Sequence, residues 1–293
     1  MKTPLSEIYP EIYAKFELNN QSGSHKIRAA RYIIKSAIER EEIIPSETTV
    51  IEKTGGNFGF GLITACKEFD LEIELAVGLG FSEKKRKYLE IMGANLIGKD
   101  MLAAGHTPKE VIDYHLNNAE YLGKKYYFTD QFNNLGSLDG HIHATAPEIA
   151  NQLKQLVSQQ EIYFVGCAGT GASFTGISKG LENNNFLVKR ILVEPFGCDS
   201  ENDIFIDHRF EGMAVGVKPP FLKWDEIDKR FHVTYQEMLT VQREFGESHG
   251  FLIGNTSAAC LHAAKKLKKQ DKNALILIVL YDNGLWYDDL LKQ

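Results

Sequence analysis

The sequence predicts an α/β protein of two domains, each with a mostly parallel twisted sheet covered by helices. Apolar runs of strand length alternate with segments of helical periodicity along most of the 293 residues, as in repeated β-α-β units. The runs VKRILVEP at 188–195 and ALILIVLY at 274–281 lack polar alternation, which is typical of strands covered on both faces. The chain length also fits one large or two medium domains.

The alternating pattern weakens at two places, 132–145 and 196–235. We therefore expect two domains that meet near residue 135, with a cleft between them. The smaller domain is predicted at 27–135, and the larger one is predicted to combine 1–26 with 136–293.

The first part of the chain predicts strands and helices in turn. The segment IYAKFEL at 12–18 is expected to be a strand, and apolar spacing from Ile27 predicts a helix that runs toward Pro45. A strand at 48–53 and a helix that ends near Phe69 follow. A strand at 71–78 precedes a helix that begins at the cap Ser82 and stops at Gly93. The remaining elements are expected as helices at 108–122 and 145–157 and strands at 125–130, 162–167, 188–195 and 274–281.

Composition excludes several classes of function. The net charge of −6 gives no electrostatic footprint for nucleic acid or for an anionic membrane. Hydrophobic residues make up 43% and charged residues 25%, as in an ordinary globular protein. The sequence contains no apolar run long enough to span a membrane and no signal peptide. Four cysteines without CxxC pairing favour a reduced, cytoplasmic protein.

The turn SGSHK at 22–26 places Lys26 directly before a predicted helix. One interpretation is a solvated lysine in the first turn of that helix, because most charged residues are simply exposed. The other is a lysine held in a tight Gly/Ser turn, whose amine forms a covalent adduct with a carbonyl compound. The turn alone does not decide between them.

The segment GCAGTGASFTG at 166–176 follows a predicted strand and opens a predicted helix, where backbone N–H groups attract anions. One interpretation is a dinucleotide site with Glu194 on the ribose, although the glycine spacing differs from GxGxxG. A second is a cradle for one phosphate, to which Thr170 and Ser173 add hydroxyls, and a third is a close-packed turn without a ligand. A similar turn occurs in TGGNFG at 54–59. A cofactor bound by its phosphate at one end and by a polar ring at the other would use both turns.

Together these motifs resemble the fold-type II pyridoxal-phosphate enzymes, most closely the cysteine synthase (O-acetylserine sulfhydrylase) and cystathionine β-synthase family. The turn ending in Lys26 is similar to the family's Gly/Ser-x-Lys turn, and TGGNFG is similar to its TSGNTG loop. GTGAS at 169–173 resembles the family's GTGGT phosphate cup. Later segments match in the same order, namely QFNN at 131–134, EGMAVG at 211–216, GNTSAA at 254–259 and YDNGLWY at 281–287.

The resemblance implies a tryptophan synthase β-like fold with pyridoxal 5′-phosphate in the interdomain cleft. It implies that Lys26 forms a Schiff base with the cofactor and later moves the substrate's Cα proton. Asn57 would bond the ring hydroxyl, and Thr256 would lie near the pyridine nitrogen. The implied cofactor-binding residues are His25, Lys26, Asn57, Gly169, Thr170, Gly171, Ala172, Ser173 and Thr256. The implied substrate-binding residues are Thr54, Gly55, Gly56, Phe58 and Gln131.

The chain departs from the family pattern at three of these positions. Gly55 and Phe58 stand where the family loop offers hydroxyls to the substrate's carboxylate, so the preferred substrate is expected to differ from plain O-acetylserine. The alternative is that backbone amides of the loop alone hold the carboxylate and that Phe58 packs outward. His25 is similar to the tryptophan synthase β pattern GAHK and would contact the phosphate or cap the turn.

The resemblance implies β-replacement on a β-substituted L-alanine, such as O-acetylserine or O-phosphoserine, with a sulfur or amine nucleophile. SHKIRAA is also similar to SFKIRGA of the serine/threonine dehydratases, which implies a deaminating lyase as an alternative. A protein that keeps the cofactor but has lost turnover, and an NAD-dependent oxidoreductase, are further alternatives. We expect an amino-acid substrate, a homodimer as the resemblance implies, and no metal site. His141 and His143 are expected in a solvated loop.

Overall fold

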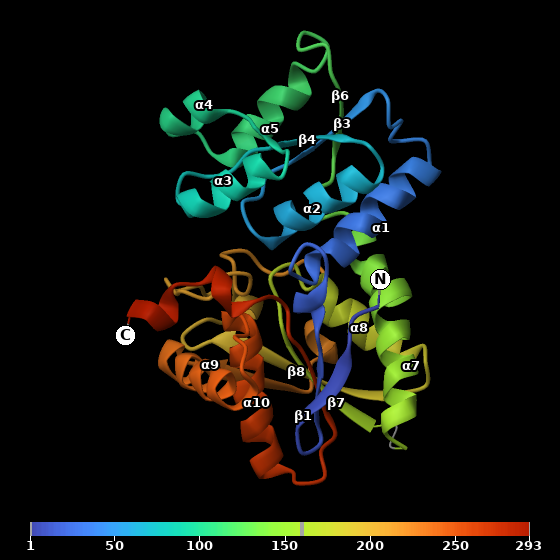
Figure 1. The fold of residues 1–293 in the computed structure, drawn as a ribbon, viewed down its shortest axis with the longest axis vertical. Coiled ribbons are helices and arrows are strands. Elements are labelled where there is room, and N and C mark those ends of the chain that lie inside the picture. The colour runs from blue at the N-terminus through green and yellow to red at the C-terminus, as the bar shows by residue number, and fades with distance from the viewer. Residues whose placement is uncertain (1, 159–160, 293) are drawn as a thin grey trace. The chain divides into compact units, whose positions relative to one another are not determined.

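The computed structural model describes residues 2–158 and 161–292 (Figure 1). The chain divides into two compact units. Unit 1 consists of Met1–His25 and Leu138–Gln293, and unit 2 consists of Lys26–Ser137. Both units are α/β, so the predicted fold class is confirmed. No helix in the described part of the chain is long and apolar enough to cross a membrane.

Unit 1 contains a six-stranded sheet in the order β1-β2-β10-β7-β8-β9. All neighbouring strands are parallel except β1, which pairs with β2 in the antiparallel sense. Its strands are β1 (Leu5–Tyr9), β2 (Ile12–Lys15), β7 (Glu161–Cys167), β8 (Leu187–Pro195), β9 (Lys229–Val233) and β10 (Ile276–Val279). Its helices include α7 (Ala146–Leu156), α8 (Ala172–Glu182), α9 (Tyr235–His249) and α10 (Asn255–Gln270).

Helices cover both faces of this sheet (Figure 1). On one face, Phe164 of β7 stacks on Phe174 of α8 with ring centroids 5.5 Å apart. On the other, the neighbouring Tyr163 donates a hydrogen bond of 3.1 Å to Asp271, directly after α10. Successive side chains of a strand point to opposite faces, so α8 and α10 lie on opposite sides.

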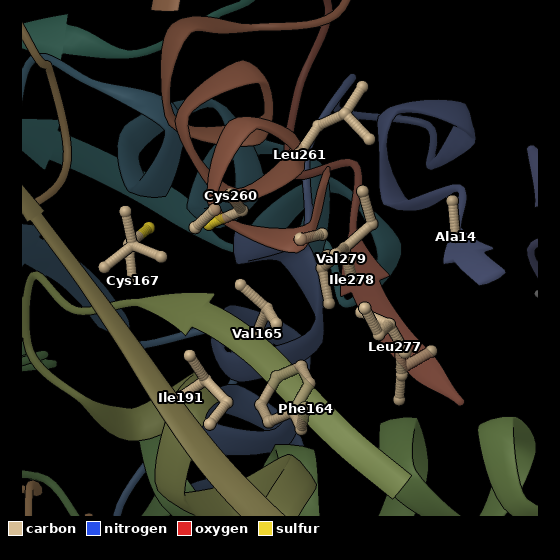
Figure 2. Packing of buried hydrophobic residues seen from close by; sticks show 14 of the residues in the cluster. Ala14, Phe164, Val165, Cys167, Ile191, Cys260, Leu261, Leu277, Ile278 and Val279 are labelled. Atoms are coloured by element: carbon tan, nitrogen blue, oxygen red, sulfur yellow. The ribbon is translucent and has the colours of Figure 1, made fainter. Parts of the chain in front are cut away.

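The core of unit 1 explains the unbroken apolar run predicted at 274–281. Every residue of β10 is buried, and Figure 2 shows Leu277, Ile278 and Val279 packed with side chains from β7 and α10. A central parallel strand has no solvent face, so polar alternation would place polar groups in apolar surroundings.

Unit 2 contains a four-stranded parallel sheet in the order β5-β4-β3-β6. Its strands are β3 (Thr48–Glu52), β4 (Glu72–Leu75), β5 (Asn95–Leu96) and β6 (Lys125–Phe128). Its helices are α1 (Lys26–Glu39), α2 (Asn57–Glu68), α3 (Glu83–Ile91), α4 (Lys99–Ala103) and α5 (Pro108–Asn117). The helices α1 and α2 approach closely at Gly61, where a Cβ atom would lie 2.8 Å from the backbone nitrogen of Ile27. Only glycine fits that contact.

Several predicted boundaries were too long. The strand expected at 12–18 stops at Lys15 and continues as a 3₁₀ turn. The helix expected to reach Pro45 ends at Glu39, and Glu41 then takes a left-handed backbone conformation with φ of 61°. Short 3₁₀ segments occur at Glu17–Asn19, Ser200–Asn202, Trp224–Glu226, Gly284–Trp286 and Asp289–Lys292.

The expectation of a solvated loop at His141 was wrong. Residues Gly136–Gly140 form the helix α6, and His141–Thr145 form one π-helical turn that leads into α7. His141 is buried, and its Nδ1 lies 3.0 Å from Oγ1 of Thr145. The histidine therefore serves the packing of this turn.

Candidate active site

The turn that carries Lys26 is fixed to the end of β10. The backbone N–H of His25 donates to the carbonyl of Tyr281 at 2.9 Å, and Ser24 forms an isolated bridge with Asp282. Gly23 has a φ of 73°, which a side chain rarely adopts, so the Gly/Ser composition of the turn has a backbone reason. Lys26 is the first residue of α1 and the first residue of unit 2.

His25 lies in unit 1 and is buried. Its ring contacts the ring of Tyr281 edge-on at 4.8 Å and lies 6.0 Å from the ring of His141. These contacts hold the side chain in one orientation directly before Lys26.

The glycine-rich turn after β7 leads straight into α8. Gly171 has a φ of 84° and is the N-terminal cap of α8, and a Cβ there would lie 2.9 Å from the backbone nitrogen of Leu222. At Gly169 a Cβ would lie 2.7 Å from the carbonyl oxygen of Gly212. Side chains are thus excluded from this turn by both conformation and space.

The first turn of α8 suits an anion. Ala172 and Ser173 are its first two residues, and the turn contains no acidic side chain. Oγ1 of Thr170 already accepts the N–H of Ala172 at 3.2 Å, which shapes the turn. A helix of 11 residues presents N–H groups and the positive end of its dipole here. These residues fit a phosphate.

Residues 212–222, which include part of the segment EGMAVG, cover this turn. The N–H of Ala214 donates to Ala168 at 3.0 Å, and that of Phe221 donates to Thr170 at 3.1 Å. Oγ1 of Thr175 in α8 donates back to the carbonyl of Phe221 at 2.7 Å. Residues 212–222 therefore brace the phosphate turn, a long-range pairing that no local pattern signals.

Thr256 is the second residue of α10 and is buried. Its helix start is also fixed to the end of β10, because Oγ of Ser257 accepts the N–H of Tyr281 at 2.8 Å. At Gly254, directly before α10, a Cβ would lie 1.8 Å from Oδ1 of Asp282, so only glycine fits.

Tyr281 links the predicted cofactor residues of unit 1. Its backbone holds His25 and Ser257, and its hydroxyl accepts the N–H of Cys167 at 3.3 Å, at the entrance to the phosphate turn. Burial and the neighbouring thiols of Cys167 and Cys260 hold the pKa of Tyr281 well above its ordinary value, so the hydroxyl stays neutral. Sequence reasoning missed this residue. Its only signal in the sequence was its place at the start of the segment YDNGLWY, which resembles a PxxGERY segment of the family and has tyrosine in place of the proline.

The loop Thr54–Phe58 of unit 2 joins β3 to α2. Gly56 is the N-terminal cap of α2 and Asn57 is its first residue. At Gly55 a Cβ would lie 2.5 Å from Cγ1 of Val77 and 2.8 Å from the ring of Phe81. The hydroxyl-bearing side chain of the related enzymes therefore has no room at position 55. Phe58 is buried, with 2% of its surface exposed.

Gln131 lies in the loop after β6, which begins at Thr129. Its N–H donates to Oε2 of Glu52 at 3.2 Å, and its carbonyl accepts Oγ of Ser137 at 3.0 Å. Glu52 is the last residue of β3, fully buried, and also bonded to Thr129. Burial raises the pKa of Glu52 to about 7, against the lowering effect of the hydrogen bonds it accepts. Sequence reasoning missed this glutamate because nothing in TTVIEK distinguishes it.

The predicted site residues thus form one group in each unit. In unit 1, Tyr281 bonds to His25 and to Cys167 and Ser257, which lie next to the glycine-rich turn and to Thr256 in the chain. In unit 2, Glu52 bonds to Gln131 and to Lys53, the residue directly before Thr54–Phe58. Among residues 2–158 and 161–292, no group of three or more His, Cys, Asp or Glu side chains could hold a metal ion.

The fold and the glycine-rich turn before α8 are typical of one class of protein. The family model of the pyridoxal-phosphate-dependent enzymes matches residues 2–282, and the chain belongs to this family. It is therefore an enzyme that uses pyridoxal phosphate. The interpretation of the glycine-rich turn at 166–176 as a dinucleotide site is set aside.

Relatives narrow the class to the expected group. The chain is 28% identical over 285 residues to an O-acetylserine dependent cystathionine beta-synthase of Bacillus subtilis, covering 93% of this chain and 86% of the relative. It is 30% identical over 276 residues to a cysteine synthase of Helicobacter pylori, covering 92% and 86%.

Solved structures agree with these relatives. An O-acetylserine dependent cystathionine beta-synthase from Helicobacter pylori has a TM-score of 0.83 at 26% identity, covering 100% of this chain and 95% of that one. O-acetyl serine sulfhydrylase isoform 3 from Entamoeba histolytica has a TM-score of 0.86 at 26% identity, covering 99% and 89%. The resemblance inferred from the sequence motifs is confirmed.

Proposed function

We propose that this enzyme catalyses β-replacement on O-acetylserine or a related β-substituted alanine, with a sulfur or amine nucleophile. The family membership and the names of the relatives support this reaction class. The observation that carries the site is the turn at 22–26, which is bonded to Tyr281 and Asp282 and delivers Lys26 at the start of α1.

Each group of residues has a proposed task. Bound pyridoxal phosphate would supply an aldehyde for a covalent link to an amine and a ring that draws electrons from the substrate's Cα. The amine of Lys26 would hold the cofactor and then carry the proton between Cα and solvent. Gly169–Ser173 would bind the phosphate, with His25 beside this group. Asn57 would bond the ring hydroxyl.

The remaining residues would set the chemistry and the substrate. Thr256 would place a neutral hydroxyl near the pyridine nitrogen, which suits loss of a β-substituent better than transamination. Backbone amides of Thr54–Phe58, together with Gln131, would hold the substrate's carboxylate. The Cβ–O bond would break, acetate or phosphate would leave with its electron pair, and the nucleophile would form the new bond at the same carbon after losing a proton.

The test is a product assay with the holoenzyme. Incubation with O-acetylserine and sulfide is expected to yield cysteine and acetate in equal amounts, and Lys26→Ala is expected to yield neither. Pyruvate formed without an added nucleophile would instead indicate the deaminating lyase. A holoenzyme that releases neither acetate from O-acetylserine nor phosphate from O-phosphoserine, with sulfide or with an amine, would contradict the proposal.

We also propose a cytoplasmic homodimer. Four free, buried cysteines suit a reducing compartment, and dimer formation is implied by the resemblance. Sedimentation equilibrium is expected to give twice the chain mass of 33.0 kDa. A single-chain mass at micromolar concentration would contradict the dimer.

A further inference from the structure

Glu52 stands out among the buried charged residues of unit 2. It is 0% exposed at the carboxyl end of β3. Its Oε1 accepts the N–H of Lys53 at 2.8 Å, and its Oε2 accepts Oγ1 of Thr129 at 2.6 Å and the N–H of Gln131 at 3.2 Å. Burying a carboxyl group is costly unless it is well hydrogen-bonded. All three of these bonds go to loop positions that follow strands.

The three donors belong to two loops at one edge of the sheet. Lys53 opens the loop after β3, which continues into Thr54–Phe58, and Thr129 and Gln131 open the loop after β6. The strands β3 and β6 are parallel neighbours, so both loops leave the same end of the sheet. The carboxyl group of Glu52 accepts hydrogen bonds from both loops.

Besides its bonds to Glu52, the loop after β6 has a backbone bond to β3, from the N–H of Thr129 to the carbonyl of Ile51 at 3.3 Å, and bonds within itself. Asn134 donates to the carbonyl of Thr129 at 3.0 Å, and Ser137 donates to that of Gln131 at 3.0 Å. Asp130 takes a left-handed conformation with φ of 41°, which is strained for a residue with a side chain. Internal bonds give the loop a shape, and the bonds to Glu52 fix it relative to Thr54–Phe58.

We propose that Glu52 is a positioning residue for substrate recognition, which holds Gln131 in register with the loop Thr54–Phe58. This inference rests on the proposed function, in which both loops bind the substrate's carboxylate. Glu52 itself touches neither substrate nor cofactor. Replacing it by glutamine keeps the shape but offers an NH₂ group where one of the backbone N–H donors needs an acceptor.

Glu74 provides a matched control in the neighbouring strand β4. It is also buried, and it accepts Oη of Tyr126 at 2.8 Å and Nδ2 of Asn95 at 3.3 Å. These partners lie in β6 and β5, Nζ of Lys124 directly before β6 lies 3.9 Å from Oε1 of Glu74, and none of the three residues has a proposed substrate contact. Glu74→Gln therefore disturbs a buried carboxyl group of the same sheet without touching either loop.

The experiment measures steady-state kinetics of the holoenzyme with O-acetylserine, together with hydrogen exchange of the peptide 129–137. Glu52→Gln is expected to raise KM for O-acetylserine at least tenfold with kcat changed less than threefold, and to speed amide exchange in 129–137. Glu74→Gln is expected to leave both unchanged. Cofactor affinity should be the same in all three proteins.

The outcomes separate the inference from the function on which it rests. A wild-type enzyme that does not turn over O-acetylserine contradicts the proposed function, whereas hydrogen exchange still reports on Glu52. Unchanged KM and exchange in Glu52→Gln, or equal losses in Glu74→Gln, would overturn the positioning role. If Glu52→Gln does not fold, Thr129→Val removes one donor and leaves the carboxyl group. It is expected to raise KM in the same direction, and an unchanged KM would overturn the proposal.

Discussion

Single residues decide where this enzyme departs from its relatives. Gly55 was expected from the sequence to lose a hydroxyl contact with the substrate. The structure adds the reason: Val77 and Phe81 fill the space that a side chain at 55 would need. The exposed part of Phe81, 42% of its surface, makes this ring a candidate wall of the substrate site. The glycine at 55 is thus coupled to the side chains of Val77 and Phe81.

We expect Gly55→Ser to lower the melting temperature and kcat/KM, because its Cβ would lie within 3 Å of two side chains. The overpacking cost is about 1–3 kcal/mol. The loss of stability caused by Gly55→Ser should be smaller in a Val77→Ala/Phe81→Ala background, because these two changes remove the colliding atoms. Gly56→Ser is the control for stability, since a Cβ there meets no described atom within 4 Å. Thermal melts and O-acetylserine kinetics check this. If Gly55→Ser lowered the melting temperature equally in wild type and in the Val77→Ala/Phe81→Ala background, the steric explanation would be refuted.

Glu52 gives a prediction for pH. Its folded-state pKa of about 7 lies above its ordinary value of 4.5, so between these pH values the folded protein holds a proton that the unfolded chain has released. The free energy of unfolding therefore falls as pH rises from about 4.5 to 7, by at most about 1.4 kcal/mol per pH unit, and is then level. Urea unfolding of wild type and Glu52→Gln checks this. The difference between the two proteins should shrink or reverse across the window, and a constant difference would contradict the shift.

At the scale of elements, much of the secondary structure could be predicted and the long-range contacts could not. The buried strands β7, β8 and β10 were recognisable because an unbroken apolar run has few alternatives. The long helices α9 and α10 and the edge strands β1 and β9 were not predicted. The segment pattern of the sequence also gave no sign that 212–222 closes over the phosphate turn, because such pairing depends on the folded topology.

The site shows the same division. Lys26, Asn57 and the turn 169–173 stood out because glycine and hydroxyl spacing is local. Tyr281 and Glu52 did not, because their partners lie far away in sequence, at Cys167 and at Thr129 and Gln131. A buried polar residue becomes visible as a hub only once its hydrogen bonds are known.

The start of α8 is the element whose function is easiest to isolate. Gly171→Ala would combine a left-handed φ with a collision against the backbone of Leu222, and is expected to weaken pyridoxal phosphate binding at least tenfold. Gly250→Ala is the control: it has a similar φ of 77° at the end of α9, with open space around its Cβ. That strain alone costs about 1–2 kcal/mol. Equilibrium titration of the apoprotein measures the affinities, and equal losses in the two variants would place the phosphate elsewhere.

At the scale of the whole molecule, the proposed cofactor residues are divided between the two units. Lys26 and Asn57 belong to unit 2, and the phosphate turn and Thr256 belong to unit 1. The chain passes between the units at the turn 22–26, so the one residue proposed to bond covalently to the cofactor stands where unit 2 begins. The proposed reaction therefore depends first on a covalent bond between Lys26 and the cofactor.

Borohydride reduction of the holoenzyme, followed by peptide mapping, tests whether Lys26 is bonded to the cofactor. Reduction fixes a lysine-bound pyridoxal group, so the mass of one pyridoxyl phosphate should appear on the peptide that contains Lys26. Lys26→Ala should fold, as judged by circular dichroism, and carry no label. A label on a different lysine, or a fully active Lys26→Ala variant, would contradict the assignment of Lys26 as the cofactor-binding lysine.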